Sequence, residues 1–334
     1  MNLKKLKNIP PWDWPAGAST LVIDTLTNRT ASNANRLLAA DLAGEYSILS
    51  EEIAAALLTV VESKDESPEL RSLAAIALGP GLEDSYMGDY EDPEASPTLS
   101  ESSVKKIQHS LHNIYLDGKA PKSVRRAALE ASVRSPQIWH AGAVQSAYAS
   151  NDAEWQLTSV FCMCYVKGFE NQILEALNSP DLTIRYHAVN AAGNWEIDAA
   201  WPYIAGLISS DKVDKPLRIA AIKAAVSIRP FQTDILDPLV DSDDEDISET
   251  TMEALAEVGY DTSWDSEDFD EDEENDEDYD EYADEEDDED FDEYVDEEEG
   301  DDEGFEGYAN EESDEDFDEY GNDEDDENDE DEDK

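Results

Sequence analysis

The sequence predicts an all-α protein, an α-solenoid of about seven stacked helix pairs followed by a disordered acidic segment. Two observations predict it: a helical pattern that recurs through residues 28–260, and an extreme charge imbalance in residues 261–334. We expect residues 1–27 to form an extended N-terminal capping segment. The repeats would then occupy residues 28–260, with an inserted acidic loop at 84–100.

The first residues are rich in proline and tryptophan. Because Pro10, Pro11 and Pro15 surround Trp12 and Trp14, we expect an extended segment whose two tryptophans cover the first helix pair. Binding of a peptide by these tryptophans is the alternative. The N-terminus lacks an apolar run of signal-peptide length, and no stretch approaches 18 apolar residues. We therefore expect a cytoplasmic protein with no membrane contact.

The repeat is clearest in the segments Glu69–Gly79 and Thr183–Gly193. Each carries an arginine, an alanine three residues later and a glycine eight residues later. The same position is occupied in turn by Arg36, Arg71, Arg125, Gln156, Arg185, Arg218 and Thr251, at spacings of 35, 54, 31, 29, 33 and 33 residues. The one long spacing predicts the loop inserted at 84–100.

Within each repeat we predict two helices. In one copy Asp181 is the expected N-cap, and Ile184, Ala188 and Ala191 share one face before Gly193. We expect this arginine-bearing helix to come first in its repeat and to pair with a second helix in which Trp201, Ile204, Leu207 and Ile208 share one face. The abundant alanines would let helices approach closely and let the repeats stack. We expect the recurring arginines to form a structural ladder with carboxylates such as Asp152 and Asp181. Ligand binding by these arginines is the alternative.

These segments resemble the HEAT family of α-solenoids, in particular the short bacterial HEAT-like repeats found in phycobilin lyases. The resemblance covers roughly residues 28–260. The whole body is also similar to a group of bacterial HEAT-repeat proteins. The resemblance implies a solenoid fold and supplies no function, and it leaves the acidic segment unexplained.

Catalytic chemistry finds little support in the residues. The deoxyhypusine hydroxylases carry paired His-Glu dipeptides, and none of the four histidines here precedes a glutamate. A metal shared by His109 and His112 is an alternative to two exposed histidines. Cys162 and Cys164 lie in an apolar run and are expected in the core, with a redox role as the alternative. We expect no enzyme activity, no cofactor and no metal site; a bilin lyase-like enzyme is a lower alternative.

Charge narrows the class of partner. Residues 1–260 carry 21 basic and 38 acidic side chains, a net charge of −17, which disfavours direct binding of nucleic acid. The densest basic cluster consists of Lys119, Lys122, Arg126 and Arg134. We predict that it receives an anionic partner or the chain's own acidic segment.

The acidic segment has its own pattern. Residues 261–334 hold 48 carboxylates and one basic residue, Lys334. Aromatic side chains recur in pairs three residues apart: Tyr279 and Tyr282, Phe291 and Tyr294, Phe305 and Tyr308, and Phe317 and Tyr320. Carboxylates with spaced rings can hold basic proteins through charge attraction and cation–π contacts. A purely solubilising tract is the alternative, and weak, non-specific binding of divalent cations is expected in either case.

The sequence therefore predicts a non-enzymatic protein-binding scaffold or adaptor. Its acidic segment would engage basic partners or shield the groove of the solenoid. The alternative is an acidic chaperone, or nucleic-acid mimic, for basic proteins.

Overall fold

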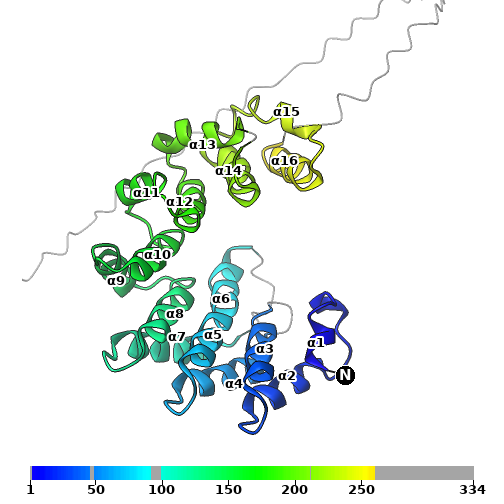
Figure 1. The fold of residues 1–334 in the computed structure, drawn as a ribbon, viewed down its shortest axis with the longest axis vertical. Helices are drawn as coiled ribbons and strands as arrows, with labels where there is room; N and C mark the ends of the chain where they lie inside the picture. Colours follow the sequence, from blue (N-terminus) through cyan, green and yellow to red (C-terminus); the bar gives the residue numbers. More distant parts are fainter. Residues whose placement is uncertain (1, 46–48, 92–98, 211, 260–334) are drawn as a thin grey trace, which may run out of the picture. The chain divides into compact units, whose positions relative to one another are not determined.

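Helices are the regular elements of the described chain (Figure 1). The fold comes from a computed structural model, which describes residues 2–45, 49–91, 99–210 and 212–259. All of these residues belong to one unit, residues 1–269. The segment 261–334 lies outside the described residues, so its predicted disorder stays a prediction. Among the described residues, no helix combines the length and hydropathy needed to cross a membrane.

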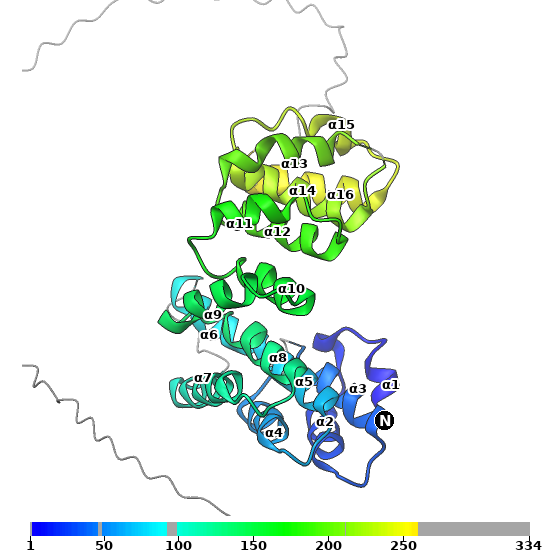
Figure 2. The same ribbon diagram turned by 60° about the vertical axis from the view of Figure 1, so that its left-hand side comes forward.

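Seven helix pairs follow one another along the chain. They are α2 (Ala18–Thr27) with α3 (Asn33–Ala43), α4 (Glu51–Glu62) with α5 (Pro68–Ala77), α7 (Glu101–Leu116) with α8 (Lys122–Ser132), α9 (Ile138–Tyr148) with α10 (Ala153–Cys162), α11 (Glu170–Ala176) with α12 (Leu182–Asn194), α13 (Trp201–Ile208) with α14 (Lys215–Ile228), and α15 (Asp237–Val240) with α16 (Glu245–Glu257). The second helix of each pair packs on the second helix of the next (Figure 2). The predicted all-α solenoid of about seven pairs is confirmed.

The contacts also correct the grouping of helices within a repeat. The sequence pattern placed the arginine-bearing helix first, joining Leu182–Asn194 to the following Trp201–Ile208. In the structure α12 pairs with the preceding α11, and α13 pairs with α14. The arginine position therefore always lies on the second helix of a pair.

Side-chain caps define where many of these helices begin. Ser32, Ser50, Ser67 and Ser100 each accept a hydrogen bond from the backbone N–H three residues later, which supplies a partner to a free helix donor. The predicted cap at Asp181 is confirmed, since its Oδ1 accepts from the N–H of Thr183 at 2.8 Å.

Two hydrophobic clusters form the core. One runs from Leu3 to Ala131, and the other from Leu129 to Leu255. Helix α8 contributes to both, because Val124 and Ala128 join the first cluster while Leu129 joins the second. Full burial of one such leucine stabilises the fold by about 1.5–3 kcal/mol.

The short helices near the N-terminus and the turn before α13 were not anticipated from the sequence. Residues 1–27 were predicted to be extended, but Ala18, Val22 and Leu26 lie at helical spacing and are buried as one face of α2. Helix α1 (Leu3–Leu6) and a 3₁₀ turn, η1 (Pro11–Asp13), precede it. A second 3₁₀ turn, η3 (Asp198–Ala200), leads into α13.

The predicted covering role of the two tryptophans is half right. Trp14 packs against the first cluster, and its indole N–H donates to the carbonyl of Ile9 at 2.9 Å. Trp12 is 78% exposed, so it does not provide the predicted cover for the first helix pair.

The predicted inserted loop begins as a helix instead, α6 (Gly79–Glu91). Its first turn buries Leu82 completely, and Gly79 and Gly81 allow close approach to Arg134 and Leu49. Burial of Leu82 stabilises this helix, which extends into the range that the sequence predicts as a loop. Residues 92–98 of the predicted loop lie outside the described residues.

The recurring arginine joins the two helices of its pair. The Nε of Arg36, Arg71, Arg125 and Arg218 donates to the carbonyl of the residue ten positions earlier, at 3.0, 2.9, 2.8 and 3.1 Å. Each acceptor is the last or next-to-last residue of the preceding helix, where carbonyls lack helical partners and the helix dipole favours a cation. The structural role predicted for these arginines is confirmed in these four pairs.

The expected carboxylate partner is present at Arg36. Arg36 also binds both carboxylate oxygens of Glu66, at 2.6 and 2.9 Å, and this lowers the pKa of Glu66. Asp152 and Asp181 cap helices instead of bonding to a recurring arginine. The contact that all four arginines share is the bond to a backbone carbonyl.

Replacing Arg71 with alanine should lower the free energy of unfolding by about 1–3 kcal/mol, because the buried carbonyl of Val61 loses its charged donor. Urea unfolding followed by circular dichroism measures this. Arg29→Ala is the matched control: Arg29 is 65% exposed and its ion pairs are long, at 3.7 Å, so a loss below about 1 kcal/mol is expected. Equal losses would contradict the structural role.

Small residues permit the close approach of neighbouring second helices. A Cβ added to Gly193 in α12 would lie 2.9 Å from the Cα of Ala224 in α14. The chain therefore has room only for hydrogen at this position.

Gly193→Ala should cost about 1–3 kcal/mol of unfolding free energy, because the added methyl group forces α12 and α14 apart. Gly142→Ala is the control, since a Cβ at this exposed helical position meets nothing within 4 Å. It should stabilise the chain by up to about 1 kcal/mol. A neutral Gly193→Ala in urea unfolding would show that the helices are not in close contact.

Candidate functional site

The predicted basic cluster lies along α8. Lys119 is exposed in the turn before the helix, Lys122 is its first residue, and Arg126 lies one turn further on. Arg134 lies beyond the last residue of α8, at the opposite end. The structure therefore brings Lys122 and Arg126 together and leaves Arg134 apart from them.

The carboxylates of the next pair neutralise this end of α8. Lys122 Nζ lies 2.8 Å from Asp152 Oδ2 and also pairs with Glu154. Arg126 Nη1 lies 3.2 Å from Glu154 Oε1, and its Nε donates to Thr158 Oγ1 at 2.7 Å. Hydrogen bonds from Lys122 lower the pKa of Asp152. An anionic partner at this cluster stays a prediction, and such a partner would have to displace these carboxylates.

Arg134 has an aromatic setting. It pairs with Glu83 of α6, and its guanidinium lies 5.7 and 5.5 Å from the ring centroids of Phe161 and Tyr165. Burial raises the pKa of Tyr165 to about 12. Tyr186 of the neighbouring α12 is 37% exposed, and its ring lies 5.5 Å from that of His187, which lies 5.3 Å from that of Phe161.

The histidines are held by neighbouring side chains. The ring of His112 stacks on Trp139 with centroids 4.2 Å apart, and His109 Nε2 lies 2.9 Å from the Asn113 amide nitrogen. His140 is fully buried, and its Nδ1 accepts from the N–H of Gln137 at 2.8 Å. Burial lowers the pKa of His140 to about 4. No group of three His, Cys, Asp or Glu side chains with metal-binding geometry occurs in the described ranges.

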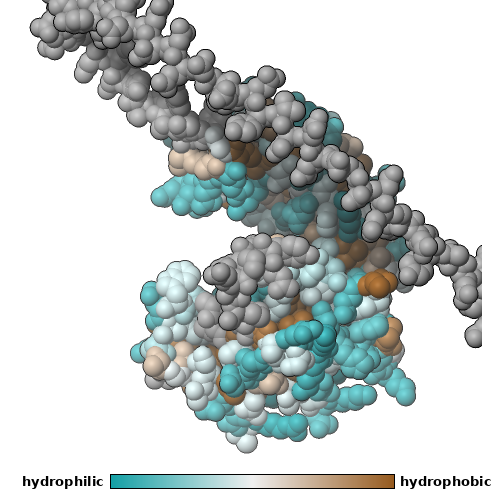
Figure 3. All heavy atoms as spheres, turned by 180° about the vertical axis from the view of Figure 1, so that it is seen from behind, coloured by the Kyte–Doolittle hydropathy of each residue, from teal (hydrophilic) through white to brown (hydrophobic). Residues whose placement is uncertain are grey.

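Fully exposed apolar side chains are few in the described chain. The largest are Ile138, beside Trp139, and Phe231, which is 98% exposed. Seen from behind, the coloured surface is mainly hydrophilic with separate hydrophobic patches (Figure 3).

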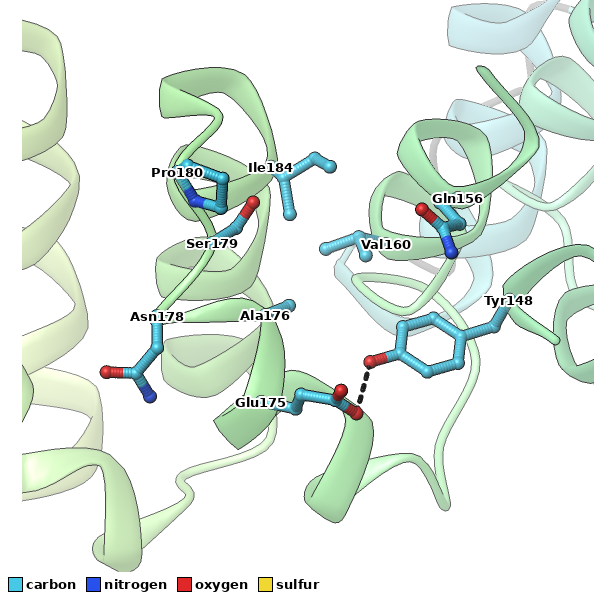
Figure 4. Close-up of a pocket in the computed structure, with 9 residues that line it drawn as sticks. All are labelled: Tyr148, Gln156, Val160, Glu175, Ala176, Asn178, Ser179, Pro180 and Ile184. Carbon is cyan, nitrogen blue, oxygen red and sulfur yellow. Dashed lines mark hydrogen bonds between the residues drawn. The ribbon is translucent and has the colours of Figure 1, made fainter. Parts of the chain in front are cut away.

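A cavity lies between the fourth and fifth helix pairs (Figure 4). Its volume is about 410 Å³, and its lining residues are Tyr148, Gln156, Val160, Glu175, Ala176, Asn178, Ser179, Pro180 and Ile184. Val160 and Ile184 point toward one another, and the Tyr148 hydroxyl donates to Glu175 Oε2 at 2.7 Å along one edge. Burial, together with Glu175, raises the pKa of Tyr148.

Two departures from the repeat occur at this cavity. Helix α11 has 7 residues, whereas the corresponding α9 has 11. Gln156 takes the arginine position in α10, and its shorter side chain donates to the carbonyl of Ser150 at 3.2 Å. In the sequence Gln156 differs from the recurring arginine by its smaller volume, and this was the signal that could have located the cavity.

The predicted aromatic binding residues of the acidic segment, from Tyr279 to Tyr320, lie outside the described residues. Their role stays a prediction.

By sequence, no protein family and no curated protein matches the chain. Among solved structures it is similar to human deoxyhypusine hydroxylase, at 15% identity and a TM-score of 0.34, over 78% of this chain and 89% of that one. It is similar to YibA of Escherichia coli at 14% identity and a TM-score of 0.41, over 77% and 97%.

A third similarity is to the CpcE–CpcF complex of phycocyanin lyase from Nostoc sp. PCC7120, at 16% identity and a TM-score of 0.39, over 74% and 98%. The helix pairs themselves, independently of these similarities, identify the fold as a HEAT-like α-solenoid.

Both thiols should be unreactive in the native chain. Cys162 is fully buried, and burial raises its pKa well above the ordinary value. Burial raises the pKa of Cys164 to about 12, so only about one in ten thousand of these thiols is ionised at pH 8. A disulfide reagent at pH 8 should label neither cysteine within minutes, and both in concentrated urea. Rapid labelling of the native chain, compared with free glutathione, would restore the redox alternative.

Proposed function

We propose that the chain is a non-enzymatic, cytoplasmic protein-binding scaffold or adaptor. Its acidic segment, residues 261–334, engages a basic partner or shields the binding surface of the repeats. The charge of that segment is the observation that carries the proposal, since 48 carboxylates face one lysine. Attraction of this size steers and holds basic proteins.

The pairing of basic side chains among the described residues favours a basic partner protein. Lys122 and Arg126 pair with carboxylates of the next helix pair, and Lys215 does the same with Asp244. Arg134 pairs with Glu83. Because these basic groups already have partners within the repeats, they contribute little to balancing the acidic surplus. A basic partner, or counter-ions, must supply that balance.

The second helices of the third to fifth pairs carry side chains typical of protein interfaces. Arg134 and Tyr165, just beyond the ends of α8 and α10, form a row of rings with one guanidinium together with Phe161 of α10 and His187 and Tyr186 of α12. Tyrosine and arginine are enriched among the residues that dominate binding energy at interfaces. This row supports protein binding by the repeats themselves.

The reactive residue types support a non-enzymatic role. Cys162 and His140 are completely buried, and Cys164 donates its thiol to the carbonyl of His187 at 3.4 Å. Burial raises the pKa values of both thiols and lowers that of His140, which in each case favours the neutral form of the group. These groups therefore serve packing.

The second candidate is an acidic chaperone or nucleic-acid mimic that acts through residues 261–334 alone. The four spaced aromatic pairs favour it, because rings add short-range contacts to charge attraction. The two candidates differ in whether the repeats contribute to binding.

Binding of a small basic protein such as lysozyme should weaken at least about tenfold when salt rises from low to physiological concentration, because exposed charges become screened. Calorimetric titration measures this. The matched control is a chain of equal length in which the acidic side chains of 261–334 are replaced by their amides. Equal affinity of the two chains would reject engagement through charge, and full affinity of the isolated segment would favour the second candidate.

A further inference from the structure

Two junctions between neighbouring pairs are each closed by one lysine. Lys122 begins α8, and its Nζ lies 2.8 Å from Oδ2 of Asp152, the N-cap of the next second helix, α10. Lys215 begins α14, and its Nζ lies 2.6 Å from Oδ1 of Asp244, the N-cap of α16. Each lysine also pairs with the residue two positions after that cap. The repeat therefore has a defined place for an ammonium group.

The junction between the fourth and fifth pairs keeps the acceptor and lacks the lysine. The first residue of α10 is Ala153, whereas the N-cap of α12 is Asp181. Asp181 Oδ1 accepts from the N–H groups of Thr183 and Ile184, as Asp152 Oδ1 accepts from its own helix. This bonding places Asp181 as Asp152 is placed, with its second oxygen corresponding to the one that holds Lys122.

The recurring arginine of the fourth pair is missing as well, because Gln156 replaces it. The cavity of about 410 Å³ lies at this same junction. In the sequence Asp181 directly follows the lining residue Pro180 and comes three positions before the lining residue Ile184. Both basic side chains that the repeat could place here are absent, and space remains.

The walls of the cavity suit the rest of a lysine side chain. Val160 and Ala176 are buried, and with Ile184 they offer apolar surface for a methylene stem. At the other edge Tyr148 donates to Glu175 Oε2, which leaves Oε1 of this exposed carboxylate free to accept. Arg185 follows Ile184 in α12 but does not line the cavity. The lining thus combines an apolar channel with negative charge, in a body whose net charge is −17.

We propose that this cavity binds a lysine side chain of a basic partner protein. The stem lies against Val160 and Ile184, and the ammonium binds Asp181 in the way that Lys122 binds Asp152. Glu175 adds a second carboxylate for a flanking basic residue. The proposal rests on the proposed function, because it takes the partner to be basic, and it names a recognition site within the repeats.

The test uses decalysine as the probe. It is carried out in the amide chain, the variant in which the acidic side chains of residues 261–334 are replaced by their amides, so that this segment contributes no charge. Asp181→Asn keeps the helix cap, since asparagine caps as well as aspartate, and removes the charge. Ala153→Lys supplies the missing lysine from within the chain. Each should weaken decalysine binding up to about fivefold, the effect of one exposed ion pair.

The controls carry the same changes away from the cavity. Asp24→Asn removes an exposed carboxylate from α2, and Ala141→Lys adds a lysine to the exposed face of α9. Both should leave decalysine affinity unchanged, and all four variants should keep the far-ultraviolet circular dichroism and unfolding midpoint of the parent. Carbodiimide cross-linking should join decalysine to Asp181 or Glu175, as located by mass spectrometry.

The outcomes separate the two proposals. If the native chain binds decalysine and the amide chain does not, the lysine site is overturned and the proposed function stands. The same conclusion follows if the cavity variants bind decalysine as tightly as their controls. No binding by the native chain at physiological salt overturns the proposed function. Binding by the amide chain that the two cavity variants weaken supports the lysine site on its own.

Discussion

The bond between the recurring arginine and a carbonyl ten residues earlier is the constraint on which the repeat depends. A guanidinium buried in this way needs an acceptor, and the free carbonyls at the end of the preceding helix provide one. In four pairs the bond ties the second helix to the end of the first. Where glutamine stands in this position, at Gln156, a cavity follows. Arg185, whose buried Nε has no partner, lies in the pair on the other side of that cavity.

The repeat period, the arginine position and the small residues could be predicted from the sequence because all of these recur within the chain. It did not show which neighbour each helix packs on, since a periodic pattern has no preferred starting point; only contacts such as α11 with α12 resolve it. Helix α2 was missed because it has no arginine, although Val22 and Leu26 followed the helical period. Lys122 looked like part of a free cluster because its partner Asp152 lies 30 residues away in sequence.

The distribution of charge links the architecture to the proposed role. Inside the repeats, basic side chains bind partners at fixed positions: arginines bind at helix ends, and lysines bind at two of the junctions between pairs. Negative groups remain in excess both on the repeats and in the segment that follows them. Such a protein gains most from partners that bring lysine and arginine. The junction between the fourth and fifth pairs, where Ala153 takes the lysine position, is the place in the repeats that we propose for such a contact.

Helix α8 contributes to both hydrophobic clusters, and this bears on how cooperatively the chain unfolds. In stacked repeats, stability is close to a sum of repeat and nearest-neighbour terms, so distant pairs influence one another only through those between them. Val124 and Ala128 face one cluster, and Leu129 faces the other. Helix α8 and the contacts between α7 and α9, such as the stacking of His112 on Trp139, therefore couple the two halves of the stack. Weakening both would let each half melt at its own temperature.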